Sequence, residues 1–364
     1  MRNFLSLQPD YSKFILATDA EKEQSVKMRP SASFWKDGFK RLIKNPIAII
    51  CISIIVIALL MAIFIPIFWP YKYDEMLYTN TYGQTQQYKD WIAQGNKNDF
   101  AYLKPFELSN YEKFLQSQGK SICPHIFGTD KFGRDYFIRI IYGLRVSLAV
   151  GFFAALIVCI IGTIYGSIAG YFGGKVDMVM MRIVDVIYSL PDLLIIILLS
   201  VVLKATLADK IEGTFLEPIG FGMISIFIVY GLLYWVGMAR MVRGQVMAIK
   251  KQEYVLAART FGASPKRIIF KHLLPNCIGI IIVTTALQIP AAIFTESFLS
   301  YVGLGVNIPM PSLGSLASDA SKLSVMIHYS YMIYISAGSI LILVLSLNLL
   351  GDALRDAFDP KLRK

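Results

Sequence analysis

The chain has 364 residues, of which 55% are hydrophobic and only 17% are charged, and its mean hydropathy is +0.54. These values exclude an ordinary soluble domain and indicate several membrane spans. The formal net charge of +11 would suit a nucleic-acid partner, but the placement of the charges explains it without nucleic acid, as described below.

Charge-free runs long enough to cross a bilayer, which takes roughly 20 helical residues, occur five times. They predict spans at residues 45–71, 146–174, 218–239, 273–295 and 323–351. A sixth span is predicted at residues 178–203, because the run LLIIILLSVVL would otherwise lie in water. Its first half carries Arg182, Asp185, Pro191 and Asp192. The predicted fold class is therefore an all-α polytopic membrane protein with six transmembrane helices.

The spans divide the chain into a cytoplasmic leader (1–44), a first transmembrane helix (45–71), an extracytoplasmic segment (72–145), a core of five helices (146–353) and a cytoplasmic tail (354–364). The leader does not have the form of a cleavable signal peptide, and its first 33 residues are expected to be mobile. Within the outer segment, residues 74–121 form an insertion rich in Tyr, Gln, Asn and Lys. Its aromatic content predicts a small subdomain with one or two helices.

The charge distribution predicts that both termini are cytoplasmic, in a multi-pass protein of the cell membrane. With that orientation the inner segments hold 23 Lys and Arg against 11 Asp and Glu, whereas the outer segments hold 13 of each. An excess of basic residues on the cytoplasmic side is the usual pattern in membrane proteins. The basic composition therefore reflects orientation in lipid.

Cysteine and histidine give no sign of a metal or catalytic centre. Cys51, Cys159 and Cys277 lie in apolar runs, so only Cys123 is expected to face water and no intrachain disulfide is predicted. The three histidines lack zinc-type spacing and are expected to be surface or interfacial residues. We predict no enzyme active site and no cofactor bound by this chain.

Two short motifs are better explained as turns than as ligand sites. GTDKFGRD at residues 128–135 has fewer alternating oxygen ligands than a calcium loop needs. GYFGGK at residues 170–175 is too short for a phosphate-binding loop and lacks the Ser or Thr that would follow the lysine. The chain is not expected to bind ATP by itself.

The stretch KQEYVLAARTFGASPKRIIFKHLLPN, residues 251–276, predicts a helix-turn-helix in a basic cytoplasmic segment. Gly262 suits the left-handed residue that ends the first helix, and Ser264 followed by Pro265 suits the start of the second. The second helix is expected to end at Pro275. Glu253 and Ala257 share one face of the first helix, and the adjacent face is formed by Tyr254, Ala258 and Phe261.

This stretch resembles the EAA loop of ABC-importer permeases, whose pattern E-x-x-x-A-A, then G, then L-P is matched at Glu253, Ala257, Ala258, Gly262 and Pro275. Further segments, GYFGGKVDMVMMRIVDVIYSLPDLL and ESFLSYVGLGVNIPMPSLG among them, look like the C-type permease subunit of the dipeptide, oligopeptide and nickel importers. The resemblance covers about residues 34–364. It departs from the family at Leu313, where Trp is usual, and in the longer outer insertion.

The resemblance implies a type I ABC importer permease fold in which residues 247–275 form the coupling loop that docks on a cytoplasmic ATPase. The docking residues implied are Glu253, Tyr254, Ala257, Ala258, Phe261, Gly262, Ala263, Ser264 and Pro265. The implied partners are a second, homologous permease, two ATPase subunits that bind ATP and Mg, an extracytoplasmic binding protein, membrane lipid and a peptide cargo.

Asp192 and Glu296 are the ionisable residues nearest to the membrane interior, so each is a candidate for the substrate path or for structural hydrogen bonding. Three other functions stay open at this stage. A self-sufficient secondary transporter would favour inverted repeats and buried coupling carboxylates, a receptor or scaffold would explain the outer insertion alone, and a related permease could carry nickel or another small solute.

Overall fold

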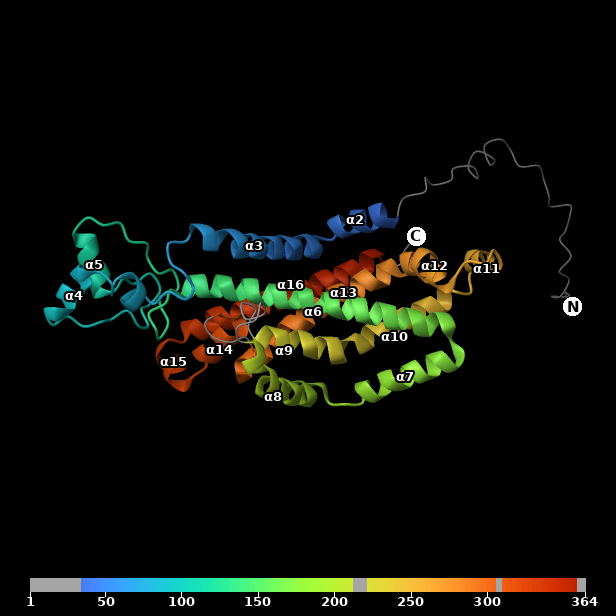
Figure 1. Ribbon diagram of the computed structural model, residues 1–364. Coiled ribbons are helices and arrows are strands. Elements are labelled where there is room, and N and C mark those ends of the chain that lie inside the picture. Colours follow the sequence, from blue (N-terminus) through green and yellow to red (C-terminus); the bar gives the residue numbers. More distant parts are fainter. Residues whose placement is uncertain (1–33, 212–220, 306–309, 359–364) are drawn as a thin grey trace, which may run out of the picture.

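The computed structural model describes residues 34–211, 221–305 and 310–358, and every regular element in these ranges is helical. Five helices are long and apolar enough to cross a membrane, and one bent pair adds a sixth crossing if the pair is counted as one span. Figure 1 shows these helices running side by side, with α4 and α5 at one end of the molecule and α11 and α12 at the other. The leader expected to be mobile, residues 1–33, lies outside the described residues.

The first crossing helix, α3 (Pro46–Phe68), agrees closely with its prediction. The Asn45 side chain caps it by accepting a hydrogen bond from the Ile47 amide at 3.0 Å, and a proline follows at the first helical position. The end of the leader is also helical: α2 (Phe34–Lys44) packs through Leu42 into a cluster that contains Phe358. Residues 34–44 are thus tied to the C-terminal helix.

The second crossing helix, α6 (Tyr136–Phe172), begins well before the predicted Val146. The prediction was wrong at this boundary because it required a charge-free run. Arg139 is nevertheless accommodated inside the helix, where its guanidinium donates to the Tyr73 carbonyl at 3.1 Å. The Asp135 carboxylate caps the helix by accepting from the Ile138 amide.

The sixth predicted span, residues 178–203, is a broken one. It consists of α7 (Gly174–Tyr188) and α8 (Asp192–Ile211), which meet at 84°. Pro191 has no amide hydrogen to donate and disfavours helical backbone at Leu190, so the helix cannot pass through this point. The charged first half therefore forms a helix of its own.

Two other crossings are longer than predicted, and both extend further towards the segment that joins them. The helical run Gly222–Ile249 comprises α9 (Phe221–Val229), the π-helical turn η4 (Tyr230–Tyr234) and α10 (Trp235–Ile249). The run Pro265–Val302 comprises α12 (Pro265–Arg267), the π-helical η5 (Ile268–Leu273) and α13 (Leu274–Val302). The prediction that the second loop helix ends at Pro275 is wrong, because that proline occupies the first turn of α13, where no amide hydrogen is needed.

The last predicted span, residues 323–351, is divided. It contains the short α15 (Leu323–His328) and most of the crossing helix α16 (Tyr331–Phe358). Another short helix, α14 (Leu313–Ala320), precedes α15. The predicted tail 354–364 therefore begins inside α16, and its final residues, 359–364, lie outside the described part of the chain.

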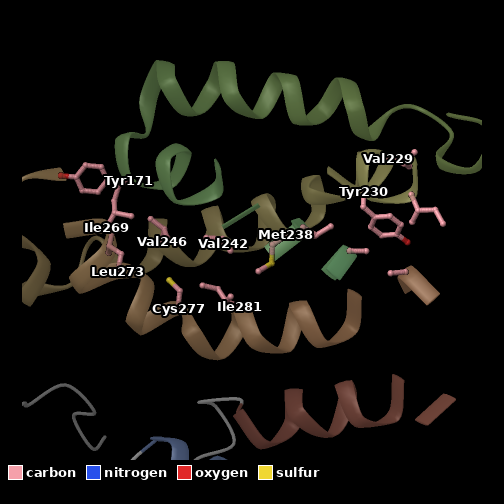
Figure 2. Close-up of a cluster of buried hydrophobic side chains, with 14 of the residues drawn as sticks. Tyr171, Val229, Tyr230, Met238, Val242, Val246, Ile269, Leu273, Cys277 and Ile281 are labelled. Atoms are coloured by element: carbon pink, nitrogen blue, oxygen red, sulfur yellow. The ribbon is translucent and has the colours of Figure 1, made fainter. Parts of the chain in front are cut away.

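The core of the bundle is centred on α6 and α10. Figure 2 shows its buried side chains, among them Met238, Val242 and Val246 of α10. Gly162, Gly166 and Gly170 recur at every fourth residue of α6 and face the α10 backbone. A Cβ added at Gly166 would lie 2.4 Å from the Ala239 carbonyl oxygen. The helices can approach this closely only because α6 carries no side chain here.

The outer segment is folded, as its aromatic content predicted. It contains the π-helical turn η2 (Leu77–Thr81) and the helices α4 (Gln86–Ala93) and α5 (Asn110–Ser117). Rings from α4, from α5 and from the loop between them share one buried cluster that includes Tyr88, Trp91, Phe100 and Tyr111. The segment GTDKFGRD is a turn, in which the Asp130 carboxylate accepts from the amides of Phe132 and Arg134.

His125 is fully buried in this region, so the expectation of surface or interfacial histidines is wrong for it. Its Nδ1 lies 2.8 Å from a carboxylate oxygen of Asp135, the capping residue of α6, and its Nε2 lies 3.2 Å from Glu112 of α5. Burial on its own lowers the pKa of His125, but the hydrogen bonds to Asp135 and Glu112 outweigh it and raise the pKa to about 9. The imidazolium thus ties the outer subdomain to the bundle.

Candidate functional site

The segment between α10 and α13 lies at the end of the molecule opposite to the outer subdomain (Figure 1). Its first helix, α11 (Glu253–Thr260), is short, and only Val255 on it is buried, with 1% of its surface exposed. Val255 packs in the main core cluster together with Ile268, Ile269 and Leu273 of η5. One anchoring side chain and the following π-helical segment therefore fix the position of α11.

The turn after α11 has the geometry that the sequence predicted. Gly262 has φ +77°, its amide donates to the Arg259 carbonyl at 2.9 Å, and the Ala263 amide donates to the Ala258 carbonyl at 3.1 Å. This pair of hydrogen bonds is a Schellman motif, in which a left-handed residue terminates a helix. The Ser264 hydroxyl then accepts from the Arg267 amide at 3.4 Å, and Pro265 begins α12, as expected.

The predicted docking residues all lie on this helix-turn-helix, and most of them face outward. Phe261 has 90% of its side chain exposed, at the tip of the turn. Glu253, Tyr254 and Ala257 are also exposed, whereas Ala258 is half-buried. An exposed phenylalanine beside a tyrosine and a small residue forms an apolar surface with an acidic edge, which is suited to protein contact.

Ionic contacts that sequence analysis did not identify hold the base of this loop. Arg243 of α10 forms a bidentate ion pair with Asp177 at the start of α7. The Lys250 ammonium, at the end of α10, donates to the Gly170 carbonyl of α6 at 2.7 Å. Both contacts join residues far apart in the chain, and such pairs are not visible in a sequence. The only available signal concerned the Lys250 contact, because basic side chains favour the carbonyl groups at helix C-termini.

The two candidate residues for the substrate path lie in different surroundings. Glu296 of α13 is fully buried, and its carboxylate accepts from the hydroxyls of Ser147 and Ser300, each at 2.8 Å. Ser147 belongs to α6, so this group joins two crossing helices and its geometry favours the structural alternative. Asp192 is exposed at the bend between α7 and α8 and lines a cavity.

Groups of three or more His, Cys, Asp or Glu residues that could hold a metal ion are absent from the described ranges. All four cysteines are free, and Cys123 is partly exposed as expected.

Comparison with known proteins identifies two family models. Residues 162–364 match the binding-protein-dependent transport system inner membrane component, and residues 33–94 match the N-terminal transmembrane domain of oligopeptide transport permease C. An oligopeptide transport system permease protein of Bacillus subtilis is 41% identical over 96% of this chain and 95% of the relative. A dipeptide transport system permease protein of the same organism is 39% identical over 96% and 93%.

A solved structure of the MetNI methionine ABC transporter in inward-facing conformations is 20% identical, with a TM-score of 0.48, and the match covers 61% of this chain and 97% of that one. From the two family models and the two relatives, which extend over nearly the full length, we conclude that this chain is a polytopic α-helical membrane protein of the binding-protein-dependent transport system inner membrane component family.

Proposed function

We propose that this chain is one of two paired permease subunits of an ATP-driven importer and that its cargo is peptide. The exposed helix-turn-helix 253–265 carries this proposal, since it offers Phe261 and the adjacent face of α11 to a partner. The partner is a cytoplasmic ATPase, which binds ATP and Mg; the chain itself supplies no catalytic group. The second permease is a homologue, and an extracytoplasmic binding protein delivers the cargo.

The continuous helical run Pro265–Val302 supports a coupling role for this loop. Movement of a docked ATPase would be transmitted through η5 into a helix that crosses the whole membrane. The two permeases would then alternate between inward- and outward-facing states. Peptide is proposed as cargo because the relatives are named as oligopeptide and dipeptide transport permeases.

Reconstitution in liposomes tests the proposed function directly. The chain is purified with its paired permease and both ATPases, and uptake of a labelled peptide is measured with the binding protein outside and ATP inside. We expect uptake to require both. Uptake driven by a proton or sodium gradient without ATP would establish a secondary transporter, and transport of nickel but not peptide would reassign the cargo.

The orientation of the chain is the first specific prediction. Lys97→Cys and Ser264→Cys both place a thiol at an exposed position. Lys97 lies between α4 and α5 and Ser264 between α11 and α12, and these two pairs of helices lie at opposite ends of the molecule (Figure 1). In a Cys123→Ser background, a membrane-impermeant maleimide added to intact cells should label Lys97→Cys but not Ser264→Cys. Lysed cells supply the control for reactivity. Labelling of both variants in intact cells would contradict the proposed topology.

The coupling role gives the second prediction. Gly262→Val introduces a β-branched residue at φ +77°, which should cost about 1–3 kcal/mol and distort the turn. We expect the variant to reach the membrane and pair with its homologue, but to lose ATPase docking or the coupling of ATP hydrolysis to uptake. The exposed Glu253→Lys should give the same loss by reversing a charge without altering the turn.

Gly244→Val is the matched control for Gly262→Val, because Gly244 has no positive φ and an added Cβ would meet nothing within 4 Å. This control should retain more activity than either loop variant. Normal docking and normal uptake in both Gly262→Val and Glu253→Lys would show that the loop does not transmit the motion.

A further inference from the structure

The bend between α7 and α8 borders a cavity of about 160 Å³. Its lining includes Tyr188 and Asp192 at the bend, Tyr234 of η4, Gly237 of α10 and Gln288 of α13. Five helical elements thus converge on it. A cavity of about 150 Å³ accepts a molecule the size of benzene, so this one has room for a single side chain of a cargo.

The cavity lies at the depth of the membrane interior. Tyr234 is near the middle of the crossing run Gly222–Ile249, and Gln288 is near the middle of α13. Broken helices at this depth are where transporters commonly form polar sites, and π-helical turns such as η4 are frequent at functional positions. The position therefore suits a point on the path of a cargo.

Two polar side chains that line this cavity, those of Asp192 and Gln288, are available to a ligand. Within the described ranges, neither the Asp192 carboxylate nor the Gln288 amide forms a side-chain hydrogen bond or an ion pair. In contrast, the Glu296 carboxylate accepts hydrogen bonds from two serine hydroxyls. Asp192 is exposed and Gln288 is partly buried, so both polar groups are accessible to a molecule that enters the cavity.

The charge balance near the cavity is negative. Arg240 lies over the Tyr188 ring at 4.1 Å, but its guanidinium is paired with Asp185 at 2.8 Å. Asp192 has no such counter-charge among the described residues. The Asp192 carboxylate will therefore attract a cation and repel an anion that passes it.

We propose that Asp192, with Gln288 and the Tyr234 ring beside it, forms a charge-selective subsite on the translocation path. This subsite favours cargo with a positively charged side chain over cargo with a negatively charged one. This inference rests on the proposed function and names a specificity-determining residue for it. The carboxylate accepts the hydrogen bonds of the cation, the amide oxygen can accept another, and the aromatic face adds cation–π attraction.

The experiment compares two peptides of equal length that differ only by lysine or glutamate at one position. Both are supplied at concentrations that saturate the binding protein, and ATP-driven uptake is measured in the reconstituted complex. The quantity compared is the ratio of lysine-peptide to glutamate-peptide uptake, so effects of the shared N-terminal amine cancel. We expect Asp192→Asn to lower this ratio about tenfold, equivalent to 1.4 kcal/mol, and Asp192→Lys to invert it.

Two further variants separate selectivity from damage. Asp352→Asn removes an exposed carboxylate of α16 that does not line the cavity, and it should leave the ratio unchanged. Asn remains a good residue for a helix start, so Asp192→Asn should not disturb α8. At Gly237 an added Cβ would meet nothing within 4 Å, and Gly237→Leu should reduce uptake of both peptides by filling the cavity.

An unchanged ratio in Asp192→Asn and Asp192→Lys, with uptake intact, would overturn this inference and leave the proposed function standing. Absence of ATP-driven uptake of either peptide by the unmodified complex would overturn both.

Discussion

Replacing Gly166 with leucine is expected to separate α6 from α10 and to prevent correct folding of the bundle. A Cβ at this position would lie 2.4 Å from the Ala239 carbonyl oxygen and 3.1 Å from the Ala239 Cα. These are backbone atoms of the facing helix, so no rotamer change can make room. We expect destabilisation of about 3 kcal/mol, the upper part of the range for overpacked sites, measured as lower yield and a lower thermal unfolding temperature in detergent.

Gly338→Leu is the matched control for this change. Gly338 lies in the crossing helix α16, and a Cβ added there would meet nothing within 4 Å. The control should therefore unfold close to the temperature of the unmodified chain. Equal unfolding temperatures for Gly166→Leu and Gly338→Leu would mean that the close approach of α6 and α10 is dispensable.

Removal of the buried imidazole is expected to have an effect of similar size. His125→Ala leaves the Glu112 and Asp135 carboxylates facing each other without their shared cation. Breaking a buried ion pair by deleting one partner typically costs about 3–5 kcal/mol. We expect the outer subdomain to detach from the start of α6, which limited proteolysis would detect as new cleavage within residues 74–121.

His328→Ala provides the control, because His328 is exposed and its Nδ1 contacts only the Ser324 carbonyl of its own helix. This variant should keep the protease resistance of the unmodified chain. If His125→Ala is equally resistant, the imidazole does not hold the subdomain in place.

The same site predicts a dependence on pH. The pKa of His125 is raised from 6.5 to about 9, so the folded state binds the proton more tightly than the unfolded chain. Its stabilising contribution is complete below pH 6.5 and is lost as the pH rises through 9. Burial also raises the pKa of Tyr71 and Tyr82, so these neighbouring phenols stay neutral over this interval. Protease resistance of the outer subdomain should therefore fall between pH 7 and pH 10.

His125→Gln removes the titrating group while keeping a side chain that can donate a hydrogen bond. Its resistance to protease should be low at every pH in this interval, with no transition near pH 9. A transition of unchanged size in this variant would assign the pH dependence to another group.

The helices were largely predictable from the sequence because apolar runs report directly on lipid exposure. The turn at Gly262 and the start at Ser264 and Pro265 could also be predicted, since each depends on local backbone preferences. Helix boundaries near charged residues could not be predicted from the sequence. Arg139 lies inside α6 only because a carbonyl and a carboxylate from the outer segment reach it, and such contacts are not local.

The missed features of the candidate sites have the same origin. The contacts of His125 with Glu112 and Asp135 depend on the folding of α5 against the start of α6. The cavity beside Asp192 depends on a bend, a π-helical turn and a third helix, of which only Pro191 was a visible signal. The four-residue spacing of Gly162, Gly166 and Gly170 is visible in the sequence and is typical of close helix packing, but no prediction was drawn from it.

The unbroken helical run from Pro265 to Val302 provides an internal reference distance for spectroscopic measurements. Its 38 helical residues span roughly 55 Å at 1.5 Å per residue. A pair of probes at Lys266 and Val302 should report one constant separation in every nucleotide state. Distances from either probe to other helices would then measure the displacement of those helices alone. A shorter distance between the two probes themselves would indicate bending of the run, which we expect at the π-helical segment Ile268–Leu273.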